Sequence, residues 1–439
     1  ILFALLILVL SLAVIYGSYY YWRLVRLSRL TAAERNAEIE EERPRKRCLD
    51  AFRGMTIVLM IFVNSGGGDY WWIKHSTWNG LHVADLVFPW FLWIMGVCIP
   101  ISINAQMLRD RTFTKKAVLL SIFVRSVKLF LVGLCLNTAH GPHMEDIRIM
   151  GVLQRFGIAY FVVATMHVIC IKPPNLYPIA ILPNGRLKSA LYDIYLLAFQ
   201  WIAILCLTCV HLILVFGISV PGCPRGYLGP GGKQDDAKYM DCIGGATGYI
   251  DRLILGETHI YQHPTALYTY DAKPFDPEGL VGCLTTILQV FIGYQCGMTF
   301  LIYTNLKLMR LLIWSIALGM IGGILCSFSQ DDGFIPINKN LWSLSFVFVT
   351  SSLAYLLFII FYVVIDVYRY WSGTPFVYAG MNAIVMYVGH EVFHSMLPWH
   401  WHIGPMNTHF VLLLENMWNA AVWVVIAYVL HCKKIFIKI

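Results

Sequence analysis

Residues 56–96 read TIVLMIFVNSGGGDYWWIKHSTWNGLHVADLVFPWFLWIMG, a polar segment between two apolar runs. A helix that crosses a bilayer needs about 20 predominantly apolar residues, and both runs fit the core of such a helix. The polar segment, residues 64–80, holds a run of three glycines, three tryptophans and one histidine. The pattern predicts two membrane-spanning helices joined by a chemically rich loop at the membrane surface.

The composition of the whole chain supports the same interpretation. Of its 439 residues, 58% are hydrophobic and only 13% are charged, which is typical of a polytopic membrane protein. We predict an all-α fold with about 11 transmembrane helices and a Cys-containing loop on the outer side. The predicted spans are residues 1–22, 50–65, 82–104, 117–136, 149–171, 191–217, 279–303, 309–328, 343–367, 375–395 and 412–431.

These spans divide the chain into three parts. Residues 1–22 form the first transmembrane helix, and residues 23–49 form a charged linker of mixed sign. Residues 50–439 form a catalytic transmembrane domain of ten helices, in which the long loop 218–278 joins two of them. Glycine and proline dominate the start of this loop, which predicts a lid built of turns.

Lys and Arg are distributed unequally between the two sets of loops. The set that includes 23–49 and the C-terminal tail holds 21 of them, and the opposite set, which includes loop 218–278, holds 8. Because cytosolic loops are enriched in basic residues, the linker and the C-terminus are predicted to be cytosolic. Loop 218–278 and the N-terminal side of the first helix then face the lumen. The net charge of +8 therefore reflects topology, and nucleic-acid binding is not expected.

The cysteines agree with this topology. Of the 12 cysteines, only Cys223 and Cys242 lie in an outer loop, where an oxidising compartment favours disulfides. These two pair either with each other or with a partner outside this chain. The cysteine pattern does not resemble a zinc site, so we predict no metal.

Histidines gather on the predicted outer side, which holds 12 of the 14. Imidazole serves as a base near neutral pH, yet it is also common at membrane interfaces. His75 differs because it follows Asn64 and a glycine run, Gly66 to Gly68, whose backbone N–H groups are suited to bind an anion. An amide donor and a base are the minimum for acyl transfer, so Asn64 and His75 are candidate catalytic residues. The alternative is an ordinary interfacial loop.

Ionisable residues also lie in or beside the predicted spans, where a charge is costly and usually faces a polar cavity. Two interpretations remain open. The first is a set of structural ion pairs, with Asp50, Asp85 or Glu391 as partners, and the second is a tunnel for an anionic ligand. The residues concerned are Arg53, Arg125, Lys128, Arg148, Gln154, Arg155, His390 and Glu391.

Motifs that carry a family resemblance run in order from about residue 46 to the end of the chain. They are LDAFRGMTIVLMIFVNSGGGDYWWIKHSTWNGLHVADLVFPWFLWIMG, RIMGVLQRFGIAYFVVA, PGCPRGYLGPGG, GGATGYIDRLILG, DPEGLVG, GFIPINKNLWSLSFV, GMNAIVMYVGHEVF and KKIFIKI. In these motifs the chain resembles the heparan-alpha-glucosaminide N-acetyltransferase family of lysosomal membrane enzymes.

The resemblance implies a transmembrane reaction. Cytosolic acetyl-CoA donates its acetyl group to the amine of a terminal non-reducing glucosamine of heparan sulfate, for lysosomal degradation of that polymer. The family's catalytic histidine corresponds to His75 and its neighbouring asparagine to Asn64. Direct transfer in a ternary complex and an acetyl-histidine intermediate both remain open. The expected CoA-binding residues are Arg53, Arg125, Lys128 and Arg155, and the expected sugar-binding residues are Trp78, Arg148, His390 and Glu391.

The resemblance also implies a place in the cell and partners. We expect a multi-pass protein of the lysosomal membrane that contacts lipid and forms a homodimer. Family members carry a lumenal domain before the first span, so we expect a missing N-terminal lumenal domain in this chain. Two other classes are kept: a polytopic transporter of an anionic metabolite, which has no need of an Asn–Gly–His loop, and a scaffold subunit, which leaves the outward histidines unexplained.

Overall fold

The computed structural model describes residues 46–109, 114–138, 141, 143–170, 191–303, 307–394 and 396–437, and these residues form two compact units. Unit 1 combines the segments Ile1–Tyr70 and Ile360–Lys438, and unit 2 is Trp71–Ile359. The predicted span 1–22 and nearly all of the linker 23–49 lie outside the described residues. In the described ranges the fold is all-helical, and eight helices are long and apolar enough to cross a membrane, which confirms the predicted class.

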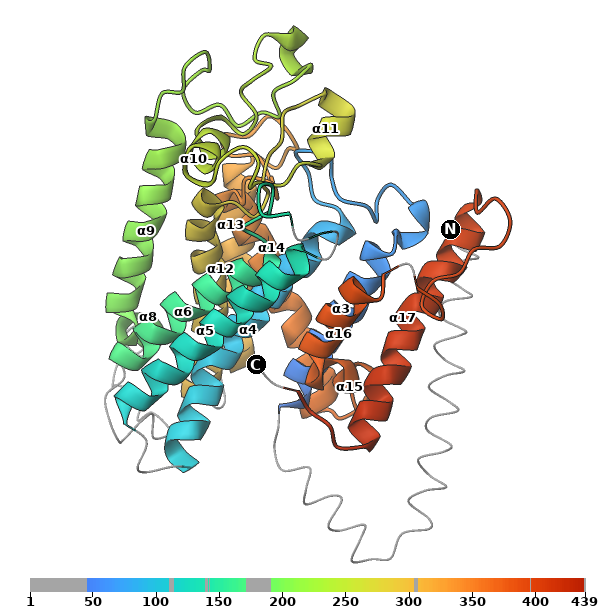
Figure 1. Cartoon of the computed structure of the whole chain (residues 1–439). Coiled ribbons are helices and arrows are strands. Elements are labelled where there is room, and N and C mark those ends of the chain that lie inside the picture. Colours follow the sequence, from blue (N-terminus) through green and yellow to red (C-terminus); the bar gives the residue numbers. More distant parts are fainter. Residues whose placement is uncertain are drawn as a thin grey trace, which may run out of the picture. The chain divides into compact units, whose positions relative to one another are not determined.

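Unit 2 is a helical bundle built around one central helix, α12 (Figure 1). Twenty of the 23 residues of α12 are buried. Its closest partner is α4, and a Cβ at Gly293 would lie 2.1 Å from the Trp93 carbonyl oxygen, so only glycine permits this approach. The helices of unit 2 are α4 Val83–Arg109, α5 Lys115–Asn137, α6 Val152–Cys170, α8 Tyr192–Leu196, α9 Ala198–Gly217, α10 Gly245–Leu255, α11 Thr265–Tyr270, α12 Leu280–Ile302, α13 Lys307–Leu325 and α14 Leu344–Phe361, the last of which ends in unit 1.

Three connecting segments of unit 2 lie together at one end of this bundle, which we call the loop end: 71–82, 218–279 and 326–343 (Figure 1). Side chains from one segment satisfy backbone groups of another. The indole N–H of Trp78 donates to the Leu228 carbonyl at 2.8 Å, and the Thr265 hydroxyl donates to the Thr77 carbonyl at 3.0 Å. These contacts join the long loop to the segment that carries His75.

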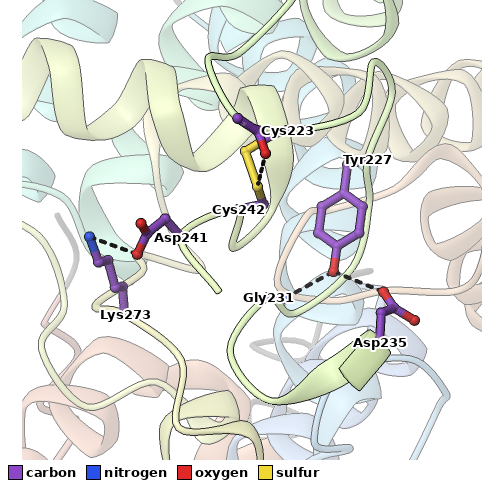
Figure 2. The surroundings of a disulfide bond; sticks show 8 residues. Cys223, Tyr227, Gly231, Asp235, Asp241, Cys242 and Lys273 are labelled. Carbon is purple, nitrogen blue, oxygen red and sulfur yellow. Dashed lines mark hydrogen bonds and ion pairs between the residues drawn. A yellow bond between two sulfur atoms is a disulfide. The ribbon is translucent and has the colours of Figure 1, made fainter. Parts of the chain in front are cut away.

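A disulfide between Cys223 and Cys242 closes the first part of the long loop (Figure 2). In the same region the Tyr227 hydroxyl accepts from the Gly231 N–H and donates to Asp235. Burial raises the pKa of Tyr227 to about 12, so this hydroxyl keeps its proton across the physiological range. The loop is therefore folded around specific turns, as its glycine and proline content indicates.

Unit 1 contains the helix before the glycine run and the C-terminal helices. Asn64 is the last residue of its first helix, and the three glycines follow as a tight turn, φ +116°, +59° and +71°. Such backbone angles favour glycine strongly. The elements of unit 1 are α3 Arg47–Asn64, the short 3₁₀ turn η1 Gly67–Asp69, the π-helical turn η3 Tyr362–Val367, α15 Phe376–Met381, α16 Ala383–Val392 and α17 His409–Cys432.

Two predicted spans differ from the structure in their continuity. The span 375–395 is two short helices, α15 and α16, that meet at Asn382. The side-chain amide of Asn382 donates to the Ile435 carbonyl and accepts from the Ile437 N–H, both in the C-terminal tail. The span 191–217 is interrupted at Leu197, between α8 and α9. Hydropathy alone cannot register such breaks, because each segment remains apolar on average across its break. The total of 11 spans stays a prediction.

Candidate active site

The ring of His75 is held at the loop end of unit 2 by Asp85, which lies on the first turn of α4. His75 Nδ1 donates to Asp85 Oδ1 at 2.7 Å, and the other oxygen, Oδ2, accepts from the backbone N–H groups of Ser76 and His82. Asp85 is fully buried, whereas the His75 side chain is 36% exposed. The carboxylate therefore fixes the tautomer, and Nε2 carries the lone pair that can accept a proton.

Lys339, from the segment before α14, occupies the other side of the same ring. Its Nζ lies 3.0 Å from Nδ1 and 3.3 Å from Nε2 of His75, and 3.9 Å from Asp85 Oδ1. The pKa of His75 is lowered by burial and, next, by the charge of Lys339, against the opposite effect of Asp85. The imidazole is therefore neutral to a lower pH than a free histidine.

A second ionic group adjoins this one. Arg148 donates to Asp276 and Glu278, with both contacts at 2.6 Å, and its guanidinium lies over the ring of Tyr261. Glu278 is buried, and its charge raises the pKa values of both His75 and Lys339. Arg148 was expected to bind the sugar, but in this structure two carboxylates occupy its donors.

Asn64 belongs to unit 1 and has its own partner there. Its amide Nδ2 lies 3.0 Å from Nε2 of His390, whose Nδ1 donates to the Met386 carbonyl at 3.1 Å. This tautomer leaves Nε2 as an acceptor for one amide N–H of Asn64, and the second N–H has no acceptor among the residues that the structure describes. His390 is 5% exposed, which makes it a support for Asn64 rather than a surface for sugar. Its neighbour Glu391 is 42% exposed.

The glycine turn after Asn64 is bound by polar side chains of α17. Asn416 accepts from the Gly68 N–H at 2.7 Å and donates to the Ser65 carbonyl, and Asn419 donates to the Ser65 hydroxyl at 2.7 Å. The Gly66 N–H donates to the Val63 carbonyl. The expectation of an anion site made from three free glycine N–H groups is therefore wrong for two of them, because protein atoms already accept those bonds.

The four cations expected to bind CoA lie in different surroundings. Arg53 pairs with Asp50, as the ion-pair interpretation predicted, and Arg155 is buried, with one N–H donated to the Gly279 carbonyl and its guanidinium over Trp342. Arg125 and Lys128 lie on an exposed face of α5. Arg125 contacts the ring and hydroxyl of Tyr160, and no carboxylate of the described residues forms an ion pair with either cation.

Trp78 has a place that the sequence did not indicate. It is 3% exposed and packs against Phe275 in a small core beneath the long loop, together with Ile243 and Leu341. A side chain so enclosed cannot stack on a sugar. The neighbouring Trp71 is 74% exposed, and sequence alone offers no signal that separates these two tryptophans.

Sequence reasoning also missed several residues that the structure brings to the candidate site. Lys339 and Glu278 contribute to the surroundings of His75, although they are more than 200 positions distant in the chain. Asp85 was considered only as a structural ion-pair partner. A carboxylate at the start of the helix after a histidine loop was the one local signal for it.

The chain is similar to two curated proteins named heparan-alpha-glucosaminide N-acetyltransferase. It is 46% identical to the Homo sapiens protein over 404 residues and 46% identical to the Mus musculus protein over 407 residues, which is 90% of this chain in both cases. The chain spans about 60% of the length of these relatives. No family model matches the chain. The likeness confirms the resemblance that the motifs predicted.

Proposed function

We propose that this chain, like the acetyltransferases that it resembles, transfers the acetyl group of acetyl-CoA to the amine of a terminal glucosamine of heparan sulfate. The observation that carries the proposal is the arrangement around His75. A buried carboxylate holds Nδ1, so that Nε2 of a partly exposed ring, 3.3 Å from Lys339 Nζ, is the nitrogen that can act as a base. The names of relatives that are 46% identical over nine tenths of the chain give the acceptor class.

The reaction requires two proton transfers and one exchange of bonds. A glucosamine ammonium ion is not nucleophilic, so His75 Nε2 first removes one proton, and the lone pair that this frees attacks the thioester carbonyl. The new C–N bond forms and the C–S bond breaks. A second proton of the nitrogen passes to the departing sulfur to give the CoA thiol, and His75 releases the first proton to solvent. In a second route Nε2 takes the acetyl group first and passes it to the amine. We favour direct transfer, because it needs no acyl-imidazole exposed to water.

Asn64 is proposed to stabilise the negative charge that develops on the thioester oxygen. Within the described ranges no protein group accepts from its second amide N–H, and His390 fixes the plane of the amide. A fixed donor of this kind lowers the barrier because it needs no reorganisation when the charge appears. The rigid glycine turn that follows Asn64 holds the end of α3 in place.

Arg125 and Lys128 are proposed to hold the phosphates of CoA. Two cations on an exposed face of an apolar helix are costly against lipid, so an anionic ligand accounts for their position. Arg53 and Arg155 are weaker candidates, because protein groups occupy them. In this proposal CoA enters from the cytosol and its acyl end reaches the lumenal side, where the loop end lies.

The same proposal includes location and assembly. The loop end of unit 2 faces the lumen of the lysosome, and the C-terminal tail faces the cytosol, as the Lys and Arg distribution indicates. Membrane lipid surrounds the apolar helices, and the protein works as a homodimer. The Cys223–Cys242 disulfide suits an oxidising compartment on the loop side.

The test is acetylation of glucosamine by the purified 439-residue chain, with acetylated product measured by mass spectrometry. His75→Gln should lower turnover by at least about 10²-fold, since general base catalysis contributes roughly 10²–10⁴. His263→Gln, which changes an exposed histidine of the long loop, is the matched control and should leave turnover unchanged. Near-normal turnover of His75→Gln would exclude His75 as the base. Uptake of intact acetyl-CoA into vesicles without acetylated product would favour the transporter instead.

A further inference from the structure

We infer that Lys339 is a positioning residue for His75: its ammonium group, 3.0 and 3.3 Å from the two ring nitrogens, keeps the imidazole from taking up a second proton. The inference rests on the proposed function, in which neutral His75 is the base. In this inference, Lys339 helps to set how far the pH can fall before His75 is protonated and can no longer act as a base.

The position of Lys339 is fixed by contacts of its neighbour. Asn338 is fully buried and forms an isolated β-bridge with Asn79, and their side chains are also hydrogen-bonded at 3.0 Å. The Gly80 N–H donates to the Ile337 carbonyl at 2.8 Å. Asn79 lies four residues after His75, so the bridge brings Lys339 to the histidine loop itself.

The charges around the ring explain why the ammonium group matters. With His75 neutral, Asp85 and Lys339 balance each other within 3.9 Å. A proton on Nε2 would add a second cation to a site where the Lys339 side chain is only 15% exposed. The charge of Glu278 raises the pKa of both His75 and Lys339, but Glu278 is already paired with Arg148 at 2.6 Å.

The arrangement has a chemical purpose in an acidic compartment. A base must be neutral to accept a proton, and an ordinary histidine would be largely protonated at a pH below its usual pKa. Asp85 alone would make this worse, because a carboxylate beside Nδ1 favours the imidazolium form. Burial of the ring and, next, the charge of Lys339 offset that effect while Asp85 keeps its role in orienting the ring.

The experiment measures the protonation of His75 without acetyl donor or acceptor. Diethyl pyrocarbonate modifies only neutral imidazole. Its reaction with each histidine, followed against pH by peptide mass spectrometry, gives for His75 the pH at which half of the imidazole is neutral, which we call the midpoint. Exposed His263 is the internal reference in the same digest. In the wild type the midpoint of His75 should lie below that of His263, and equal midpoints would overturn the inference.

Removal of the charge gives the second arm. In Lys339→Met, or in Lys339→Gln if the methionine variant does not fold, the His75 midpoint should rise by about one pH unit, a tenfold loss of neutral imidazole at a given pH below it. In the plot of turnover against pH, the pH of half-maximal turnover on the acid side should rise by the same amount. Lys233→Met removes an exposed cation, paired with Asp271, and should move neither.

The two readouts separate the inference from the proposed function. An unchanged His75 midpoint in a folded Lys339 variant would overturn the inference, whatever the turnover does. A raised midpoint with an unmoved acid limb would support the place of Lys339 and overturn His75 as the base of the reaction.

Discussion

The two candidate catalytic residues are held by different kinds of interaction. In unit 1, the turn after Asn64 is bound by the amides of Asn416 and Asn419, and behind the turn these amides contact the ion pair of Glu415 and His400. In unit 2, His75 lies between the charges of Asp85 and Lys339. The first arrangement fixes geometry, whereas the second fixes both geometry and protonation.

The difference matches the tasks proposed for the two residues. An amide donor has one protonation state, so Asn64 needs only a fixed direction, which hydrogen bonds supply. A base changes its protonation in each turnover, and the free energy of that change depends on nearby charge. Substitutions that preserve shape but alter charge next to the two residues should therefore affect His75 strongly and Asn64 weakly.

The largest effect is expected for Asp85→Asn. Both oxygens of Asp85 accept hydrogen bonds, Oδ1 from His75 and Oδ2 from two backbone N–H groups. An amide has only one oxygen, and if it serves the backbone, its NH₂ faces Nδ1 and moves the histidine proton to Nε2. The ring then has no lone pair for the substrate proton, and turnover should fall by about 10²-fold or more.

The control for this substitution is Asp241→Asn, which alters an exposed carboxylate paired with Lys273 (Figure 2). Its turnover in the same acetylation assay should match the wild type. If Asp85→Asn also retained near-normal turnover, charge and tautomer would not matter at His75, and the contrast between the two units would be lost.

A smaller effect is expected in unit 1 for Asn416→Ala. The change removes the acceptor of the buried Gly68 N–H and the amide that donates to the Ser65 carbonyl and the Glu415 carboxylate. An unsatisfied buried group costs about 1–3 kcal/mol, so the melting temperature should fall. Thr408→Ala tests the same helix away from the glycine turn, since the Thr408 hydroxyl caps the first turn of α17.

Two measurements on Asn416→Ala keep stability and chemistry apart. The acid limb of the turnover profile should stay at the wild-type pH, because no charge near His75 has changed. A shifted acid limb in this variant would contradict the assignment of orientation to the contacts around Asn64 and of charge to the contacts around His75.

The sequence predicted the fold class because hydropathy and Lys/Arg distribution act over whole segments. It could not predict the break at Asn382, which depends on contacts with the tail at Ile435 and Ile437. The π-helical turn after α14 is a further local departure that hydropathy does not register. Segment-level properties predict that a helix crosses a membrane, but individual hydrogen bonds decide where it bends.

The candidate site was predictable only where it is local in sequence. Asn64, the glycine run and His75 lie within one short segment, whereas Lys339 reaches His75 through the bridge between Asn338 and Asn79. Burial was the other obstacle: Trp78 and Trp71 have the same side chain in the same loop, yet one is enclosed and the other is exposed. A single sequence shows neither which distant residues are in contact nor which of two identical side chains is buried.

The smallest effect is expected at Asp251, a buried carboxylate of α10 in unit 2 that lies outside the His75 group. Its Oδ1 accepts from the N–H groups of Leu280 and Val281 at the start of α12, and Oδ2 has no hydrogen-bond partner among the described residues. Burial raises the pKa of Asp251 from 3.8 to about 6, so folding favours the protonated form. This stabilisation is present at low pH and is lost as the pH rises through 6.

Between pH 5 and pH 7 the loss amounts to about 1 kcal/mol. Asp251→Asn replaces the carboxyl group by a neutral amide that can still accept at Oδ1, so the melting temperature of this variant should fall less than that of the wild type between these two pH values. Asp271→Asn, at an exposed carboxylate paired with Lys233, is the matched control and should keep the wild-type dependence. Because other titrating groups are common to all three proteins, the difference between their slopes isolates Asp251. Equal slopes for Asp251→Asn and the wild type would mean that this carboxylate is ionised in the folded protein, and that buried charge in unit 2 is tolerated away from His75 as well.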